Sequence, residues 1–490
     1  MSALSVPVAS HITDDGGRRA AARSCVRAVL LVVLVVAYSL VLRVVYTGLI
    51  SGPFAYAGYT SVPQAWQDGV ASTMLTAIVA LLLPRRITCA SDVVLWMMLG
   101  VCVGPAILMS GYTGYLDPAG AAAFSMLLAV VFSAAALAVR WRRDTGSALS
   151  TAPATAADSM LVGSRVVRRE TLAWVLCGLY SLGTYGLMAV TTGFQFRLVA
   201  LDEVYDVRAA YADDLAAGGG LGYLLSGQAY VVNAYVMIRA LAKRAWPLFA
   251  LGVVGQYLLY STTGFKTVLF SIPAMVVIAV VLRRRRPRSG FPLLFGPVVL
   301  MVGSAIVDEA QGGITWTSLF SRRFIVTPGL LTSVYADYFS EHPVALWARS
   351  FTRFWVTSPY DTTPTKTIGQ YMLPGSNVNA NANLFADGYA NLGAVGVVVI
   401  AAVLAAWLRV LDRWSRGLPV PVVGVLFVMS AVTLSNTSIL TAMLSHGLLV
   451  ATLLVAVMPR GGWGVLSPGE ASALGKPERG QARRSFQRRA

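Results

Sequence analysis

The chain has 490 residues, of which 56% are hydrophobic and only 12% are charged, and its mean hydropathy is +0.65. A soluble globular protein carries about twice that charged fraction, so the composition excludes an ordinary soluble enzyme or binding module. The net charge of +17 would suggest nucleic-acid binding in a soluble chain. In a membrane protein it follows instead from the enrichment of Lys and Arg in cytoplasmic loops, and we expect no nucleic acid among the partners.

Continuous apolar runs recur along the chain, for example at 28–42 and 394–408. About twenty such residues span a bilayer as a helix, and continuous runs favour helices over the alternating strands of a barrel. The predicted fold class is therefore all-α, a polytopic membrane helix bundle of about twelve transmembrane helices. The predicted spans are 27–49, 67–84, 91–111, 120–140, 171–193, 221–242, 246–263, 267–282, 291–308, 391–411, 419–435 and 439–458.

The positive-inside rule predicts the orientation of these spans. If the N-terminus is cytoplasmic, every connection expected inside contains Lys or Arg, from Arg85-Arg86 to the arginine run at 283–286. We therefore place both termini in the cytoplasm. The predicted organisation is a cytoplasmic tail (1–26), nine spans (27–308), a long external loop holding the active site (309–390), three spans (391–458) and a basic, disordered cytoplasmic tail (459–490).

The external loop 309–390 is the longest connection, and long loops in compact folds tend to carry function. It carries Arg322, Arg323, Arg349 and Arg353 on the face where positive charge is usually avoided, and Lys266 lies at another external turn. The guanidinium fork suits bidentate binding of phosphate. The alternative for each of these cations is a side chain that reaches toward lipid headgroups.

Two amphipathic helices are expected in this loop. Thr327-Pro328 is typical of a helix start and Pro343 of a helix end. This first helix lies either in the membrane interface or on the bundle, and both placements turn Asp337 toward water or a cavity. A second helical segment follows Pro343, with Trp347 and Phe351 on one face and Phe354 and Trp355 continuing that face.

The stretch 374–393 is rich in asparagine. Asn377, Asn379, Asn381 and Asn383 alternate, and Asn383, Asp387 and Asn391 then follow at helical spacing. Asparagine both donates and accepts hydrogen bonds, which suits sugar hydroxyls. Helix capping and turn formation are the alternative for one or two of these residues. No metal-spaced His or Cys cluster, P-loop or dinucleotide fingerprint occurs in the sequence, so we expect no metal and no cofactor.

These residues resemble a known family. The pattern consists of Arg323, Pro328, Tyr335, Phe339, His342-Pro343, Pro359-Tyr360-Asp361, Asn379-Ala380-Asn381 and Ala386-Asp387-Gly388-Tyr389-Ala390-Asn391 with Gly393 and Gly396. It resembles the Wzy-type oligosaccharide repeat unit polymerases, also called O-antigen polymerases. Gly264-Phe265-Lys266 is similar to that family's G-x-K element. The resemblance covers about residues 265–410.

The resemblance implies a glycosyltransferase of the bacterial inner membrane that acts on its outer face. Such an enzyme joins polyprenyl-diphosphate-linked oligosaccharide units, among membrane lipids, without a metal. Its partners can include a chain-length regulator or other polysaccharide assembly proteins. The first 260 residues share only hydropathy and topology with the family, so the resemblance does not identify which sugars the enzyme would join.

We predict Arg323, Asp387 and Asp337 as catalytic residues. Fixed arginines would stabilise the diphosphate leaving group, and a carboxylate or imidazole would take the proton of the acceptor hydroxyl. The identity of that base stays open among Asp337, Glu341, His342, Asp361 and Asp387. The predicted substrate-binding residues are Arg322, Arg349, Arg353, Lys266, Tyr335, His342, Asp361, Asn379, Asn381, Asn383, Tyr389 and Asn391. His446 is expected to be a core histidine bonded to a carbonyl group.

Other functions are compatible with parts of this pattern. A ligase would move a glycan onto another lipid or protein. A metal-dependent polyprenyl-phosphate sugar transferase usually has an acidic pair in its first external loop, and residues 50–66 contain no acidic residue. A transporter or flippase often has paired halves with broken spans, and no such pairing is evident in the sequence.

Overall fold

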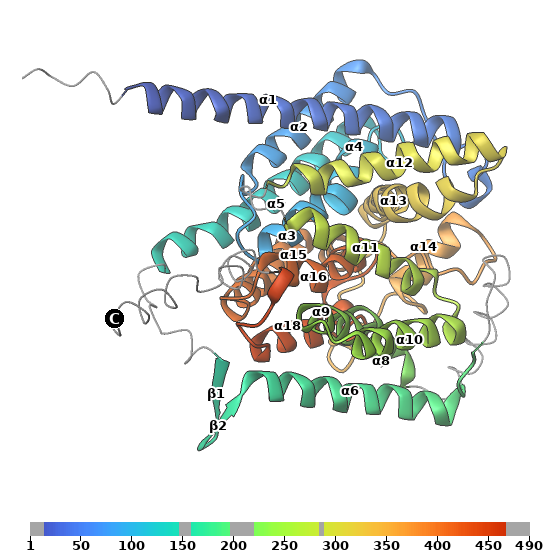
Figure 1. Cartoon of the computed structure of the whole chain (residues 1–490). Coiled ribbons are helices and arrows are strands. Elements are labelled where there is room, and N and C mark those ends of the chain that lie inside the picture. Colours follow the sequence, from blue (N-terminus) through green and yellow to red (C-terminus); the bar gives the residue numbers. More distant parts are fainter. Residues whose placement is uncertain (1–13, 147–157, 197–219, 284–288, 467–490) are drawn as a thin grey trace, which may run out of the picture.

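The computed structural model describes residues 14–146, 158–196, 220–283 and 289–466 (Figure 1). Within these ranges the chain is helical apart from one two-stranded hairpin, which confirms the all-helical prediction. Residues 1–13 and 467–490 of the predicted cytoplasmic tails lie outside the described residues.

The first quarter of the chain forms an almost continuous set of helices. α1 (Asp14–Val45) runs into a π-helical turn, η1 (Tyr46–Ile50), so the first helix begins before the predicted span. The elements that follow are η2 (Ala55–Ala57), α2 (Trp66–Leu82), α3 (Ala90–Met98), η3 (Leu99–Val103), α4 (Gly104–Met109) and α5 (Pro118–Gly146).

A short hairpin precedes the middle helices. Strands β1 (Ser159–Val162) and β2 (Arg165–Arg168) pair antiparallel across the two-residue turn Gly163-Ser164, in which Gly163 has a positive φ. The helices that follow are α6 (Arg169–Thr191), α8 (Leu221–Gly227), η5 (Gln228–Val232), α9 (Asn233–Lys243), α10 (Trp246–Thr263), α11 (Lys266–Arg283) and α12 (Phe291–Gln311).

The last third of the chain contains the segment predicted as a long loop. Its elements are η6 (Thr317–Val326), α13 (Thr327–Glu341), α14 (Pro364–Met372) and α15 (Leu384–Trp414). The closing elements are α16 (Val420–Leu434), α17 (Ile439–Ser445), α18 (Leu448–Val457) and η7 (Gly464–Leu466).

Seven helices of the described chain are long and apolar enough to cross a membrane, or eight if the bent pair α17 and α18 forms one span. The predicted count of about twelve is therefore not confirmed. Helices α2 and α16 are apolar but have only 17 and 15 residues. The segments 221–243 and α10 carry buried polar side chains that lower their hydropathy. There Asn233 accepts a hydrogen bond from Gln228 (2.8 Å) and donates one to Gln256 (3.0 Å).

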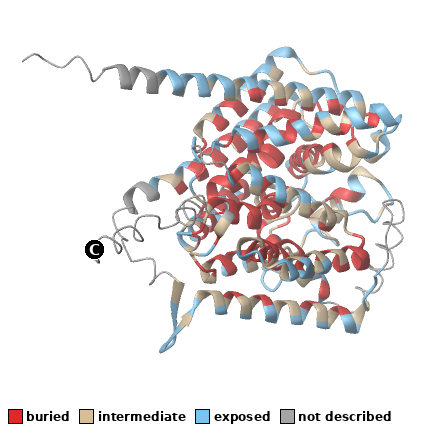
Figure 2. Ribbon diagram, in the orientation of Figure 1, coloured by how far each residue is buried: buried red, intermediate tan, exposed pale blue. Residues whose placement is uncertain are grey.

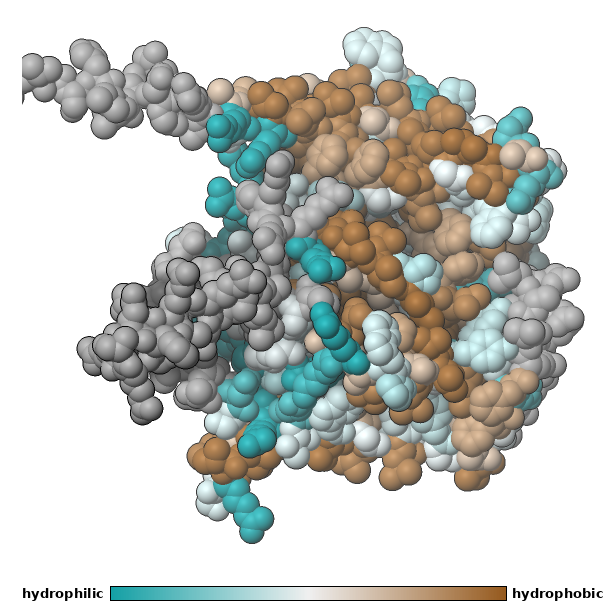
Figure 3. Space-filling view, in the orientation of Figure 1, coloured by the Kyte–Doolittle hydropathy of each residue, from teal (hydrophilic) through white to brown (hydrophobic). Residues whose placement is uncertain are grey.

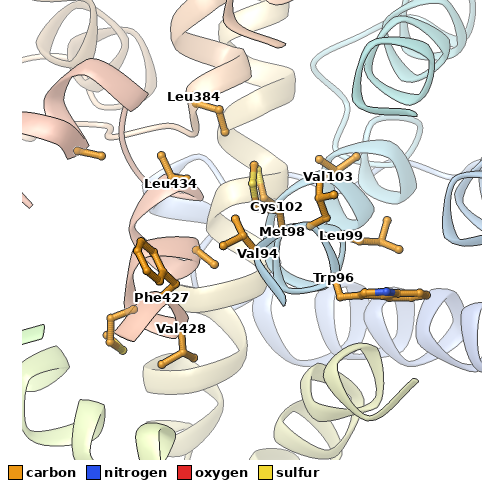
Figure 4. Packing of buried hydrophobic residues seen from close by; sticks show 14 of the residues in the cluster. Val94, Trp96, Met98, Leu99, Cys102, Val103, Leu384, Phe427, Val428 and Leu434 are labelled. Carbon is orange, nitrogen blue, oxygen red and sulfur yellow. The ribbon is translucent and has the colours of Figure 1, made fainter. Parts of the chain in front are cut away.

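The core of the bundle lies between α3, η3 and α16 (Figure 4). Val94 points toward Phe427 of α16, whereas Trp96 points away from it on the other side of the helix, and all three are buried. The 90–109 segment is 94% buried, which explains why it is apolar on every side rather than on one stripe. By contrast, the outer helices α1 and α6 expose apolar residues such as Val33 and Leu179 (Figure 2). In a membrane protein such faces lie against lipid.

The two ends of the bundle differ in charge. At the end where α1 and α12 begin and α5 ends, arginines bind the carbonyl groups at helix ends. Arg140 donates to Leu82 (2.9 Å) and Arg460 to Trp414 (2.6 Å). We call this the basic end, and Figure 3 shows hydrophilic side chains concentrated there. The opposite end, which carries η6, α13 and α14, is called the loop end (Figure 1).

Candidate functional site

The segment predicted as an external loop is largely folded into the bundle. Helix α13 packs against α4 and α15, and Leu331, Val334 and Tyr335 are buried. Of the two placements left open by the sequence, the structure therefore shows the one on the bundle. The predicted end of α13 is confirmed, since His342 is extended before Pro343. The predicted start is confirmed in position, since α13 begins at Thr327 with Pro328 in its first turn. The predicted cap by the Thr327 hydroxyl is wrong, because α13 continues directly from η6 without a side-chain cap.

The second predicted helix of this region is also wrong. Residues 346–355 form turns, and Leu346 and Trp347 have positive φ values of 55° and 50°. The cause is a set of contacts to α15: the backbone N–H of Leu346 donates to the carbonyl of Asn391 (3.2 Å), and that of Trp347 donates to the Asn391 side chain (2.7 Å). The aromatic residues 351, 354 and 355 consequently share no helical face.

A cavity of about 490 Å³ lies at the loop end. Residues from η5, η6, α13, α14, α16 and the α17–α18 break line it. Four of the predicted site residues come together there: Arg322, Arg323, Asn379 and Asn381. Lys266 begins α11 between two lining residues, Phe265 and Thr267.

The two arginines of this cavity are carried by η6, a ten-residue π-helix. Hydrogen bonds hold the C-terminal turn of η6. Thr327 Oγ1 donates to the carbonyl of Arg322 (2.7 Å), and the Tyr59 hydroxyl lies 2.7 Å from Thr327 Oγ1. The middle of η6 is held against α12 by Ser321, whose hydroxyl lies 2.7 Å from the hydroxyl of Ser304. Such π-helical turns are rare and recur at functional sites.

Arg322 and Arg323 have different surroundings. Arg322 donates from Nε and Nη2 to Ser318 Oγ (3.1 and 2.9 Å), and its guanidinium lies 4.1 Å from the ring centroid of Phe54. Arg323 is exposed and makes no hydrogen bond or ion pair with any other described residue. Arg322 is therefore anchored, while Arg323 keeps its donors for a ligand.

The asparagines reach the cavity from an extended segment. The Ala380 N–H donates to the Thr365 carbonyl (2.9 Å), and the Tyr335 hydroxyl donates to the Ala380 carbonyl (2.8 Å). Because side chains alternate along an extended chain, Asn379 and Asn381 are exposed while Ala380 is buried. Tyr335, predicted to bind substrate, instead holds this segment from the interior.

Sequence reasoning missed several lining residues, of which His446 and Tyr230 are the most informative. His446 lies at the break between α17 and α18, which bend by 66°. Its half-buried ring has Nδ1 2.9 Å from the Ser445 hydroxyl and also bonds to the backbone of Thr441. The expected backbone partner is therefore present, but the ring also lines the cavity. The sequence feature that could have indicated this break is Gly447, which interrupts an apolar run directly after the histidine.

Gly447 explains how the break reaches the cavity. Its φ is +77°, and a Cβ at this position would lie 2.6 Å from the Cα of Gly227. Only two glycines allow this approach of backbone to backbone. The contact brings His446 to the end of α8, where Ser226 and, one turn on, Tyr230 line the same cavity.

The charge of the cavity is positive. The titratable residues among the described lining are Tyr59, Tyr230, Arg322, Arg323 and His446, and no described carboxylate lines it. A cleft lined by one sign of charge concentrates ligands of the opposite sign. The cavity therefore suits an anion with polar groups.

The predicted catalytic residue Asp387 lies outside this lining, beside the turn at Trp347. It accepts from Trp347 Nε1 (3.3 Å) and from Asn391 Nδ2 (3.4 Å). Asn383 caps α15, because its side chain accepts from the N–H groups of residues 385 and 386, which supports the capping alternative there. Tyr389 packs edge-on against Phe124.

Asp337 belongs to a separate aromatic cluster. The Tyr371 hydroxyl donates to Asp337 Oδ2 (3.0 Å), and the His342 ring stacks on Tyr338 with centroids 4.0 Å apart. Burial raises the pKa of the Asp337 carboxyl, although the bond from Tyr371 opposes this. Burial and the nearby Asp337 raise the pKa of Tyr371 to about 12.

The remaining predicted residues are not in the cavity either. Arg349 donates to the carbonyl of Tyr360 (3.0 and 2.7 Å), and Arg353 lies over the ring of Phe354 (4.6 Å). Asp361 is exposed. The structure thus divides the predicted site into the cavity, the turn beside Asp387 and the cluster around Asp337.

Comparison of the chain with family models, curated proteins and solved structures finds no match. The described residues contain no group of three or more His, Cys, Asp or Glu that could hold a metal ion.

Proposed function

We propose that this protein is a membrane glycosyltransferase that polymerises polyprenyl-diphosphate-linked oligosaccharide units into a surface polysaccharide. The observation that carries the proposal is the cavity at the loop end, where two adjacent arginines and two alternating asparagines meet. A diphosphate and a sugar are the two parts of such a substrate. The resemblance of residues 265–410 to the repeat unit polymerases points to the same chemistry.

The proposal includes a membrane topology. We place the protein in the bacterial inner membrane with about twelve crossings, both termini in the cytoplasm and the loop end outside. The basic end, with its arginines at helix ends, supports this orientation under the positive-inside rule. The shorter helices α2 and α16 and the polar α8–α10 segments would supply the crossings beyond the seven or eight long apolar helices.

In the proposed reaction, a hydroxyl of the incoming unit attacks the anomeric carbon of the growing chain. The new C–O glycosidic bond forms as the bond to the diphosphate oxygen breaks, and the bond electrons leave with the polyprenyl diphosphate. Arg323 would bind the oxygens on which charge develops, with Arg322 holding the phosphate from its fixed position. Asn379 and Asn381 would bind sugar hydroxyls.

The hydroxyl proton needs a base within hydrogen-bond reach. We propose His446, because it is the described lining residue whose ordinary pKa lies near neutral pH. Asp387 and Asp337 stay predictions for this role. Neither carboxylate lines the cavity, so either one would need the acceptor to extend toward the α15 turn or the Tyr371 cluster.

The first test is a gel of surface glycan from a strain that lacks the gene. Loss of a polymerase leaves single repeat units on their lipid or carrier, without the ladder of longer chains. A deletion strain with an unchanged ladder would refute the proposal.

The second test is Arg323→Lys, which keeps the charge but loses the fork. We expect polymerisation to fall at least about tenfold at normal protein level, because a lysine cannot make the paired hydrogen bonds. Arg413→Lys is the matched control, since Arg413 is exposed at the basic end. Equal ladders from the two variants would remove Arg323 from the site.

A transporter or flippase is the second candidate, because a broken helix pair beside a cavity also occurs in transporters. Loss of a flippase would trap single units on the cytoplasmic side. A ligase, the third candidate, would leave long chains on polyprenyl diphosphate when lost. The same deletion strain therefore separates all three functions.

A further inference from the structure

A second cavity, of about 690 Å³, lies at the basic end. It is formed where the beginning of α1 meets the connection between α2 and α3 and the beginning of α12 (Figure 1). None of the residues of the loop-end site contributes to it, so whatever binds here is distinct from the proposed glycan substrate.

Four arginines line this cavity: Arg23 and Arg27 from α1, and Arg85 and Arg86 from the connection after α2. All four side chains are exposed. Arg85 donates to Ser24 Oγ (2.7 Å), which joins the two segments. The other three make no hydrogen bond or ion pair with another described residue, and no described lining residue is acidic. The guanidinium groups therefore repel one another until an anion binds.

The remaining walls are apolar. Leu30 and Leu31 of α1 and Phe291 and Pro292 of α12 line the cavity together with Trp96. The indole of Trp96 is fixed by its bond from Nε1 to the Pro84 carbonyl (2.9 Å). Helix α12 begins here without a side-chain cap, which adds a positive helix end to the four charges. The cavity thus offers phosphate-binding groups and an apolar wall in one place.

Its outer rim continues along α1 as an apolar surface. Val26, Val29, Leu30 and Val33 are each more than half exposed. A free phosphate would use only the arginines, whereas a phospholipid would also cover these residues with its acyl chains. Charge and apolar surface together therefore favour a lipid.

We propose that this cavity binds the phosphate headgroup of an anionic phospholipid in the leaflet at the basic end. The guanidinium forks would hold the phosphate oxygens and the acyl chains would lie against α1 and Phe291. Bound lipid would offset part of the charge of the arginine cluster and fix α1 against α12.

The test uses the purified full chain in detergent, titrated with phosphatidylglycerol, phosphatidylcholine or inorganic phosphate. We expect phosphatidylglycerol to raise the unfolding temperature and to remain bound in native mass spectrometry. The variant Arg27→Gln/Arg86→Gln should bind it about tenfold more weakly or worse, because two charge-assisted contacts are lost. The control Arg413→Gln/Arg416→Gln removes the same charge from exposed arginines at the same end and should retain binding.

Three outcomes would overturn the proposal. These are equal stabilisation by phosphatidylcholine, equal stabilisation by inorganic phosphate alone, and equal loss of binding in the two double variants. If the cavity variant unfolds, Ala28→Phe fills the cavity without changing charge, and it should displace the lipid in native mass spectrometry. Retention of the lipid by Ala28→Phe would likewise count against the proposal.

Discussion

The two arginine-lined cavities differ in the polar side chains that accompany their arginines. Each contains an adjacent pair, Arg322-Arg323 at the loop end and Arg85-Arg86 at the basic end. Around the first pair lie asparagine, threonine, tyrosine and histidine side chains together with apolar ones such as Phe324 and Leu331. Around the second lie leucine, phenylalanine and proline side chains. A pair of guanidinium groups indicates only an anion, and the neighbouring side chains indicate the rest of the ligand.

The supports of the two pairs differ as well. The loop-end pair is carried by a π-helix held by serine and threonine hydroxyls, with Arg322 fixed over Phe54. The basic-end pair lies in an exposed connection. The anchored Arg322 would position an anion beside Arg323, and positioned donors are what a developing charge in a reaction requires. Binding a lipid headgroup requires less positional accuracy, and this contrast is the reason for assigning chemistry to one end only.

The largest expected effect is that of His446→Gln, which would remove the proposed base from the loop-end cavity. Polymerisation by the purified chain should fall about a hundredfold, as is usual for loss of a general base. The wild-type rate should rise with pH as the imidazole loses its proton, because the base must be neutral. That rise should be absent in the variant.

The measurement is chain growth on lipid-linked units extracted from the deletion strain. Asp387→Asn is the companion variant. A large loss in Asp387→Asn together with a normal rate in His446→Gln would return the catalytic base to Asp387 and break the assignment of the reaction to this cavity.

A smaller effect, on stability, is expected for Gly447→Ala. Its positive φ costs a non-glycine residue about 1–2 kcal/mol, and the added Cβ would also meet the backbone of Gly227. We expect a loss of about 2–3 kcal/mol in the free energy of unfolding, measured by denaturation in detergent. Gly178→Ala is the control, because nothing lies within 4 Å of a Cβ there. Similar losses in both variants would show that the close contact is not needed.

The smallest effect is expected for Asp337→Asn. Burial raises the pKa of Asp337 in the folded chain, so the folded state holds this proton more tightly than the unfolded state does. This proton therefore adds to the free energy of unfolding at pH values below the pKa that Asp337 has in the unfolded chain. The contribution is lost as the pH rises through the pKa that Asp337 has in the folded chain. The asparagine is neutral throughout and can still accept from Tyr371.

The variant should therefore gain stability relative to wild type as the pH rises above about 4. Unfolding temperatures of both proteins across that range are the measurement. A difference that does not change with pH would show that Asp337 titrates as an ordinary surface carboxyl.

The sequence predicted most helices and part of the site. Continuous apolar runs predicted the helices, and Pro343 predicted the end of α13. Asn379 and Asn381, predicted to bind substrate, are both exposed, because side chains two residues apart share one side of an extended chain. These features depend on local sequence alone.

The wrong or missing predictions resulted from contacts between segments that are far apart in the sequence. Helical spacing after Pro343 was overridden by hydrogen bonds to Asn391, forty-odd residues away, and those bonds fix Trp347 at a positive φ. Asp387 shares its helix face with Asn391, yet it lies beside that turn and not in the cavity. His446 was missed because only the contact of Gly447 with Gly227 brings it to the arginines.

The break between α17 and α18 also limits what mutagenesis can remove. A helix end leaves backbone N–H and C=O groups without intrahelical partners, and this one adjoins the cavity through His446. Such groups can bind a sugar hydroxyl as well as a side chain does. An alanine substitution leaves these backbone groups in place, so recognition that rests on the backbone would survive an alanine scan of the whole lining.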